Sequence, residues 1–227
     1  LYPCFCSEVM LDELRGVAKV QGHAFVYPGT CNRIADDQAR ARMASEPHTL
    51  RFRVRSGDVR FKDAIRGDIH VETATLGDLV IRRTDTSTGG GFVYNFCCVV
   101  DDLAMNITHV IRGEDHLTNT VKQILFYEAF GVAHPAFAHL PMVLGADGSK
   151  LSKRHGATSV GEYREAGYLP EALGQGLALV GWTPRERAEE PLTILDMAQQ
   201  FKLTHVQKGG GILDAARLRH FNGLHLR

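Results

Sequence analysis

The chain has 227 residues, of which 44% are hydrophobic and 23% charged, so it is long enough to bury a core and form one or two compact domains. Its 26 basic and 26 acidic side chains cancel, which excludes an overall positive field that would attract nucleic acid but leaves room for a local basic face. No apolar run approaches the roughly 18 residues that cross a bilayer, so we expect no membrane association. The opening Leu1-Tyr2-Pro3-Cys4 is neither a signal sequence nor an initiator methionine, and we expect the natural start to be missing.

The first 83 residues predict a small α+β module. Residues 1 to about 45 contain an amphipathic stretch from Val9 to Val20 and an arginine-rich stretch that ends near Met43. Apolar and polar residues then alternate between positions 49 and 83, with Gly-Asp pairs at the turns, which is typical of short antiparallel strands. The strands are expected at Leu50–Arg55, Val59–Phe61, Ile69–Val71 and Leu79–Ile81.

A different pattern follows the tract Thr84 to Gly91, whose Thr, Ser and Gly residues predict a flexible connection. Strands and helices now alternate, which predicts a parallel sheet covered by helices. The segment Tyr94 to Val100 fits either a short strand or the start of a buried helix. The other expected elements are strands at Ile107–Ile111 and Phe137–Leu144, and helices at Thr118–Phe130, Val160–Ala166, Pro170–Gly181, Ile194–Phe201 and Asp214–Phe221.

Five cysteines in a chain without a secretory signal indicate a reducing compartment rather than a disulfide framework. Cys97 and Cys98 lie inside the apolar run Phe96 to Val100, where small buried thiols are expected. Cys4, Cys6 and Cys31 stand apart, since two lie two residues from each other and the third returns much later in the chain.

Two charged loops follow predicted strands, where open parallel sheets bind ligands. In the first, Arg112 suits a bidentate grip on a carboxylate and Gly113 lets the backbone approach a ligand. The alternative is a salt-bridged turn. The second loop, from Gly145 to Gly156, places two lysines and an arginine among small residues and suits closure over a polyphosphate. Its alternative is a solvated basic loop.

Together these loops carry a family resemblance. The chain is similar to the glutamyl-tRNA synthetases in several segments that follow in the same order: Arg112-Gly113-Glu114-Asp115-His116, Asn119-Thr120, Ala138-His139-Leu140-Pro141, Lys150-Leu151-Ser152-Lys153-Arg154-His155-Gly156-Ala157, Gly167-Tyr168-Leu169-Pro170-Glu171-Ala172-Leu173 and Leu177-Ala178-Leu179-Val180-Gly181-Trp182. The resemblance implies ATP-dependent attachment of glutamate to tRNA(Glu) through a glutamyl-adenylate, with Mg²⁺ bound to the ATP.

Residue roles come from the same resemblance. Lys150 and Lys153 match the lysines of the Lys-Met-Ser-Lys-Ser signature, which implies ATP contacts for both and stabilisation of transition-state phosphate charge by Lys153. Tyr94 and Arg112 match the positions that hold glutamate. Glu114 and Asp115 match positions that face the adenosine and the tRNA end.

A zinc site is also implied. The family has members in which three cysteines and a tyrosine or histidine hold zinc, and here these correspond to Cys4, Cys6, Cys31 and Tyr27. A phenolate is an unusual zinc ligand, so His23 competes with Tyr27 for the fourth place. The alternative is three reduced thiols without metal.

The implied architecture is an α/β fold: the second half of a class I Rossmann-type core, with an inserted α+β domain and a helical domain. We expect an acceptor-binding domain at 1–84, the core half with the Lys-Leu-Ser-Lys-Arg loop at 85–158, and a stem-contact domain at 159–227. The chain would be the central part of the ligase, inactive alone because the first Rossmann half is absent from it. A monomer is favoured, in the cytoplasm of a bacterium or the matrix or stroma of an organelle.

Two departures favour an alternative, a non-catalytic RNA- or protein-binding scaffold derived from the ligase. One is the absence of the first ATP-binding half from the sequence. The other is the glycines of Gly174-Gln175-Gly176 and Gly209-Gly210-Gly211, which would cost roughly 1 kcal/mol each inside helices.

Overall fold

The structure is a computed structural model that describes residues 1–84, 91–152, 154, 156, 159–184 and 191–227. The chain forms two compact units. The first comprises Leu1–Phe61, Asp68–Thr108 and Thr118–Pro135, and the second comprises Lys62–Gly67, His109–Leu117 and Ala136–Arg227. Most of the predicted flexible connection lies outside the described residues. Within the described ranges, no helix has both the length and the apolar character of a membrane span.

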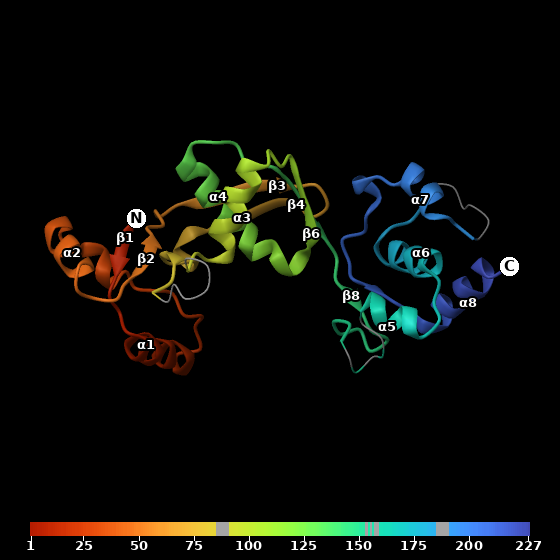
Figure 1. Cartoon of the computed structure of the whole chain (residues 1–227), viewed down its shortest axis with the longest axis horizontal. Helices are drawn as coiled ribbons and strands as arrows, with labels where there is room; N and C mark the ends of the chain where they lie inside the picture. Colours follow the sequence, from red (N-terminus) through yellow and green to blue (C-terminus); the bar gives the residue numbers. More distant parts are fainter. Residues whose placement is uncertain (85–90, 153, 155, 157–158, 185–190) are drawn as a thin grey trace. The chain divides into compact units, whose positions relative to one another are not determined.

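The first unit contains an antiparallel sheet in the order β1-β2-β5. Of the four strands expected between positions 49 and 83, only the first and the last lie in this sheet; those expected at Val59–Phe61 and Ile69–Val71 belong to another sheet, and β1 was not expected. The central strand of the β1-β2-β5 sheet pairs Arg51 with Tyr2 on one side and with Val80 on the other. Figure 1 shows the helices of this unit around its strands. The elements are β1 (Tyr2–Cys4), α1 (Glu8–Val20), η1 (Thr30–Arg33), α2 (Asp36–Met43), β2 (Thr49–Phe52), β4 (Gly67–Glu72), η2 (Thr73–Thr75), β5 (Leu79–Arg82), α3 (Tyr94–Ala104) and α4 (Leu117–Phe130).

Helices α3 and α4 supply much of the apolar core of the first unit. The segment that fitted either a strand or a helix is helical, and its Val99 is fully buried. Phe96 of α3 packs edge-on against Phe126 of α4, with ring centroids 5.7 Å apart. Tyr127, also buried, donates a hydrogen bond to Asp102 over 3.1 Å. The predicted helix forms, but its middle is buried on all sides rather than on one face, since the consecutive residues Gln123 to Tyr127 are all buried.

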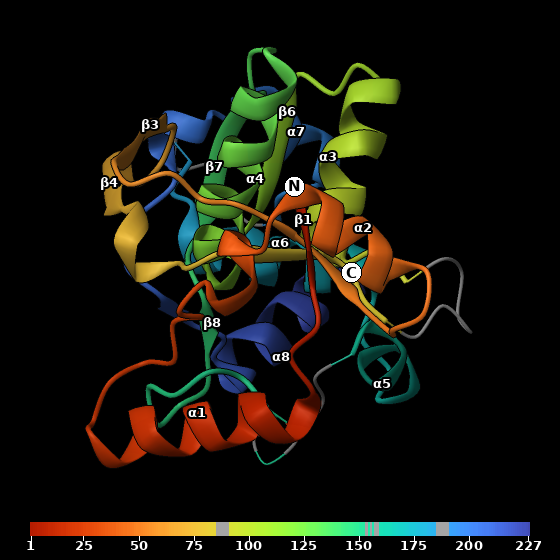
Figure 2. The same ribbon diagram turned by 90° about the vertical axis from the view of Figure 1, so that its left-hand side faces the viewer.

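The second unit contains the predicted parallel strands. Strand β6 (His109–Gly113) pairs in parallel with β7 (Ala136–Leu140), and Figure 2 shows the two side by side. Strand β3 (Asp58–Asp63) begins in the first unit and ends in the second, where Asp63 pairs in parallel with Phe137 of β7. The α/β class with a parallel, Rossmann-like sheet is therefore confirmed.

One strand prediction was wrong in its extent. The expected strand Phe137–Leu144 breaks at Pro141, which has no N–H to donate to a neighbouring strand. The remainder forms a separate strand, β8 (Val143–Leu144), which pairs in parallel with β9 (Gly211–Ile212). The sequence pattern did not predict β9.

The helices of the second unit form as predicted and have clear start signals. Ser159 and Thr193 each form a capping box, and Pro170 lies at the first position of its helix. Helix α6 packs against α7 and α8 (Figure 1). The helices are α5 (Val160–Glu165), α6 (Pro170–Gly181), α7 (Ile194–Gln200) and α8 (Ala215–His225), with short η3 (Glu114–His116) and η5 (Leu203–His205).

Three of the unexpected glycines, Gly176, Gly210 and Gly211, have packing reasons. A Cβ on Gly176 would lie 2.5 Å from Cδ1 of Leu218, a buried residue of α8. A Cβ on Gly211 would collide with the backbone oxygen of Val180. These glycines allow α6 to approach α8 and β9 closely, so they give no support to a decayed copy of the ligase.

Candidate active site and metal centre

The first charged loop lies at the carboxyl end of β6, where the sequence analysis expected it. Arg112 and Gly113 are the last residues of β6, and Glu114 starts the short η3 helix that leads into α4. A Cβ on Gly113 would lie 2.7 Å from Oδ1 of Asp115. Glycine at this position therefore lets the Asp115 carboxylate fold back against the end of the strand.

Arg112 lies beside a histidine of the neighbouring strand. Arg112 and His139 are paired in register between β6 and β7, and Nε of Arg112 donates a long hydrogen bond of 3.5 Å to Nε2 of His139. This contact holds the inner part of the guanidinium group, so an incoming carboxylate would approach its terminal nitrogens.

His139 itself belongs to a buried hydrogen-bonded pair. Its Nδ1 lies 2.6 Å from Oδ2 of Asp63, and both side chains have no exposed surface. Oδ1 of Asp63 accepts backbone hydrogen bonds from Ile65 at 2.9 Å, Arg66 at 2.8 Å and His139 at 3.2 Å. Four donors thus surround one buried carboxylate.

The pKa directions define the protonation of this pair. Burial raises the pKa of Asp63, but the backbone N–H of Arg66 and the hydrogen bond with His139 outweigh it and leave that pKa below its ordinary value. For His139, burial lowers the pKa by more than Asp63 raises it. The pair is therefore an ionised Asp63 and a neutral His139 whose proton is on Nδ1.

Sequence reasoning missed Asp63 and gave His139 no role. A signal was present, because Val59, Phe61 and Asp63 occupy alternate positions of one strand, and all three are buried. An aspartate in the buried register of a strand requires compensating donors, which marks it as a residue of interest.

Both oxygens of Glu114 have partners. Oε2 pairs with the guanidinium group of Arg66, and Oε1 accepts the backbone N–H of Met142 at 2.9 Å. The two paired side chains are 19% and 29% exposed, so this ion pair is only partly screened by water. Glu114 therefore orders the backbone just after β7.

Lys150 connects the two charged loops. Its Nζ lies 3.1 Å from Oδ2 of Asp115, and the pair is well exposed. The hydrogen bond from Lys150 lowers the pKa of Asp115. Within the second loop, Arg154 pairs with Asp147 at 3.1 Å. Exposed ion pairs contribute little to stability, so these groups can exchange their partners for a charged ligand. Lys153, the other lysine of interest, lies outside the described residues.

Tyr94 is the first residue of α3 and is 53% exposed. It belongs to the first unit, whereas Arg112 belongs to the second. Their joint grip on one substrate stays a prediction.

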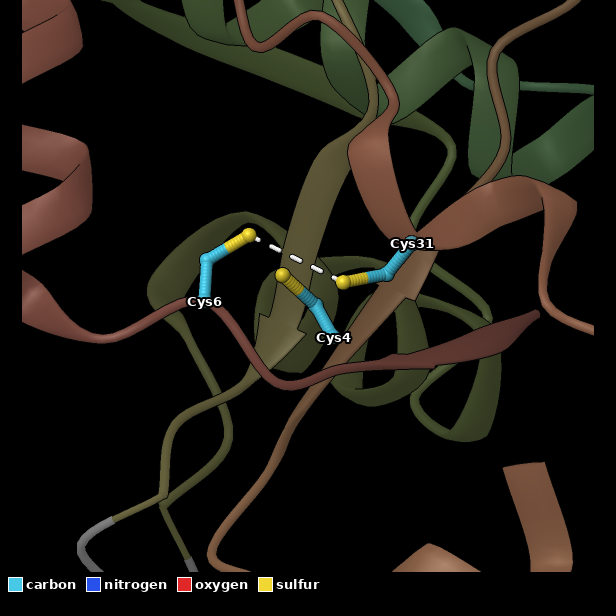
Figure 3. Close-up of side chains that lie close together, drawn as sticks. All are labelled: Cys4, Cys6 and Cys31. Carbon is cyan, nitrogen blue, oxygen red and sulfur yellow. Dashed lines mark hydrogen bonds between the residues drawn. The ribbon is translucent and has the colours of Figure 1, made fainter. Parts of the chain in front are cut away.

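The three cysteines that stood apart in the sequence form a cluster in the first unit. The sulfur atoms of Cys4, Cys6 and Cys31 lie within 4.8 Å of one another and point toward a common centre (Figure 3). The sulfur atoms of Cys6 and Cys31 are 3.7 Å apart. This is close to the sulfur–sulfur distance of about 3.8 Å expected around a tetrahedral zinc ion with Zn–S bonds of about 2.3 Å. The spacing and the donor type both fit zinc.

Tyr27 occupies the fourth place. Its hydroxyl oxygen lies 3.2 Å from the sulfur of Cys4 and 3.5 Å from that of Cys6, and accepts the backbone N–H of Cys31 at 3.1 Å. His23 is exposed, and it is absent from the potential metal-binding groups found among the described residues. Of the two candidates that competed in the sequence, only Tyr27 has the geometry of a fourth ligand.

A buried arginine provides positive charge beside this cluster. Arg51 is 6% exposed, and its guanidinium group lies 3.8 Å from the centre of the Tyr27 ring. Burial raises the pKa of Cys4, but hydrogen bonds from Tyr27, the Cys6 backbone and Arg51 outweigh it, so the net shift is downward. Burial raises the pKa of Cys6 to about 11. Cys4 is therefore more easily deprotonated for a metal than Cys6.

A parallel sheet with an arginine and a lysine-bearing loop at the carboxyl ends of its strands is typical of nucleotide-binding α/β proteins. The family model for tRNA synthetases class I (E and Q), catalytic domain, matches residues 1–220, and the chain belongs to this family. The match supports a portion of the family's catalytic domain, and it does not bear out the central part of the ligase that the sequence predicted.

Individual relatives agree with this assignment. The chain is 44% identical to a glutamate–tRNA ligase of Hydrogenobaculum sp.; the match covers 100% of this chain and 48% of the relative. It is also 44% identical to the glutamate–tRNA ligase of Aquifex aeolicus, and that match covers 100% of this chain and 47% of the relative. A crystal structure of a glutamate tRNA ligase from Elizabethkingia meningosepticum in complex with its amino acid superposes with a TM-score of 0.87 at 33% identity, covering 99% of this chain and 49% of that one. The chain thus spans about half the length of the relatives it matches.

Proposed function

We propose that the protein carrying this chain attaches glutamate to tRNA(Glu) in two steps. The glutamate α-carboxylate attacks the α-phosphate of Mg²⁺-bound ATP and releases pyrophosphate, and a terminal ribose hydroxyl of the tRNA then takes the glutamyl group and releases AMP. The observation that carries this proposal is the ion pair between Lys150 and Asp115, which joins the two charged loops at the strand end that holds Arg112. Positioning and charge stabilisation suffice for such chemistry.

Glutamate recognition is assigned to Arg112 and Tyr94. The hydrogen bond with His139 uses Nε of Arg112, so the substrate side-chain carboxylate would take the two terminal nitrogens as a bidentate pair. Tyr94 would add a hydroxyl at the start of α3, where it is more than half exposed.

ATP contacts are assigned to Lys150, Lys153, Glu114 and Asp115. Lys150 would leave Asp115 for the phosphates, and Lys153 would stabilise the charge that develops on the α-phosphate. Asp115 would then face the ribose. Glu114, which accepts the backbone N–H of Met142, would hold that backbone segment in place beside the nucleotide.

The metal-binding residues are Cys4, Cys6, Cys31 and Tyr27. Zinc there would cross-link the strand β1 to the η1 turn and stiffen residues 1–84, for which an acceptor-binding role is proposed. A pocket of about 780 Å³ lies in the same unit, and its lining carries acidic side chains (Asp36, Asp58 and Glu128) as well as Arg53 and Arg55. Residues 85–158 would be the second half of the core, and residues 159–227 the stem-contact domain.

Glutamate-dependent exchange of pyrophosphate into ATP tests the proposal directly in the natural protein. We expect exchange with glutamate, and loss of it in Lys153→Ala. Lys202→Ala, which alters an exposed lysine outside both loops, is the control and should behave like the wild type. Absence of exchange in the wild type, with retained RNA binding, would instead favour the non-catalytic scaffold.

A further inference from the structure

Asp63 is the centre of a buried network that reaches the first charged loop by two routes. One route passes through His139 to Arg112, and the other through Arg66 to Glu114. All five residues belong to the second unit. Arg112 and Glu114 flank Gly113, so a single buried carboxylate controls both sides of the loop.

The first route depends on which histidine nitrogen carries the proton. Asp63 accepts three backbone N–H groups on Oδ1, which favours its ionised form, and an ionised carboxylate requires a proton on Nδ1 of His139 at 2.6 Å. Nε2 then keeps its lone pair, and this is the nitrogen that lies 3.5 Å from Nε of Arg112. The opposite tautomer would turn an N–H toward the N–H of Arg112.

The second route is a cap and an ion pair. Oδ1 of Asp63 binds the backbone N–H of Arg66 and thereby fixes the turn after β3. The side chain of Arg66 reaches both the carbonyl of His139 and the carboxylate of Glu114. The turn thus determines where Glu114 holds the backbone of Met142.

We propose that Asp63 is a positioning residue for glutamate binding: it selects the His139 tautomer whose Nε2 accepts the hydrogen bond from Arg112 and so orients the guanidinium group. This inference rests on the proposed function, in which Arg112 grips the glutamate side chain. Asp63 touches neither substrate, and its effect reaches them only through its neighbours.

Asp63→Asn separates the two routes. An asparagine can keep its oxygen on the N–H groups of Ile65 and Arg66 while its NH₂ replaces Oδ2, and an NH₂ there forces the proton of His139 from Nδ1 to Nε2. We expect the KM for glutamate in pyrophosphate exchange to rise about 10-fold or more, as for a lost hydrogen bond to a charged group. The KM for ATP should change less than about 2-fold, because the Glu114 route survives.

His139→Gln provides the rescue. The glutamine side-chain oxygen can reach the position of Nε2 and accept from Arg112 whatever residue 63 carries. In the His139→Gln background, Asp63→Asn should therefore raise the glutamate KM far less than it does in the wild type. Equal increases in both backgrounds, or parallel increases in both KM values that follow the loss of thermal stability, would overturn the proposal.

A second readout does not need activity. Nitrogen NMR of the natural protein should show His139 protonated on Nδ1 in the wild type and on Nε2 in Asp63→Asn, with the Arg112 Nε–H signal shifted between the two. A wild-type His139 protonated on Nε2 would overturn the inference even in an active enzyme. Expected NMR signals in a protein without pyrophosphate exchange would support the orienting role of Asp63 and reject only the proposed function.

Discussion

Lys150 and Asp115, 35 positions apart in the sequence, form an ion pair of 3.1 Å between the second charged loop and the end of β6. Each residue is exposed, so the pair is screened by water and contributes little to folding. The pairing keeps the loop lysine close to the strand end before a nucleotide arrives. Its importance is therefore expected in ligand binding rather than in stability.

Lys150→Ala should separate these two properties. We expect the KM for ATP in pyrophosphate exchange to rise about 10-fold, because a charge-assisted contact with phosphate is lost. The free energy of unfolding should change by less than about 1 kcal/mol. Steady-state kinetics and thermal unfolding measure the two effects, with Lys202→Ala as the matched control. A large loss of stability with unchanged ATP kinetics would contradict this role.

Cys4→Ser and Cys31→Ser should abolish zinc binding and lower the melting temperature, since a structural zinc site contributes directly to folding. Elemental analysis of the purified protein and thermal unfolding with and without a chelator provide the measurement. Cys97→Ser and Cys98→Ser are the controls, because both cysteines lie in α3 and outside the described metal-binding cluster. If all four variants retained equal zinc, the cluster would not be the metal site.

Arg51→Met should weaken zinc binding about 10-fold without removing a ligand, because the buried guanidinium group stacks on Tyr27 and compensates the charge of the thiolates. Competition with a chromophoric chelator measures this affinity. Arg55→Met, which alters an exposed arginine three residues past the same strand's end, should leave the affinity unchanged. An identical zinc affinity in both variants would show that the charge of Arg51 does not contribute to zinc binding.

His139 should make stability depend on pH in a defined window. Burial lowers its pKa in the folded state below the ordinary value of 6.5. Below pH 6.5 the unfolded chain therefore binds more protons than the folded one, so this contribution to stability is fully present above pH 6.5 and declines as the pH falls toward the folded pKa.

The measurement is the urea midpoint at pH 7 and pH 5. The difference between the two should be smaller in His139→Gln than in the wild type. His70→Gln, at an exposed position, is the control and should retain the wild-type difference. An unchanged pH dependence in His139→Gln would show that His139 is not the titrating group.

Gly176→Ala and Gly223→Ala should have opposite effects. A methyl group on Gly176 would press against Leu218 between α6 and α8, which we expect to cost about 1–3 kcal/mol. Gly223 lies in α8 with nothing within 4 Å of a Cβ, so alanine there should stabilise by about 0.5–1 kcal/mol. Chemical denaturation compares the two, and a stabilising Gly176→Ala would contradict close packing of these helices.

Much of the fold was predictable because its signals are local. Apolar spacing in α1, α4 and α6 and the capping residues Ser159 and Thr193 define helices from neighbouring residues alone. Strand alternation likewise predicted the strands between positions 49 and 83, although two of the four belong to another sheet than the one expected. The three-domain division and the assigned substrate contacts are still predictions, because they concern ligands and parts of the enzyme rather than local patterns.

The sequence by itself determined most of the elements, the two charged loops and the cysteine set, since each depends on residue type and short spacing. Only the tertiary structure decided that Asp63 meets His139 across 76 positions, that the Tyr27 hydroxyl lies 3.2 Å from the sulfur of Cys4, and that β9 pairs with β8 beyond Pro141. The physical reason is that a buried polar group takes its partners from whatever strand packing brings within hydrogen-bonding distance, and chain spacing carries no record of that proximity.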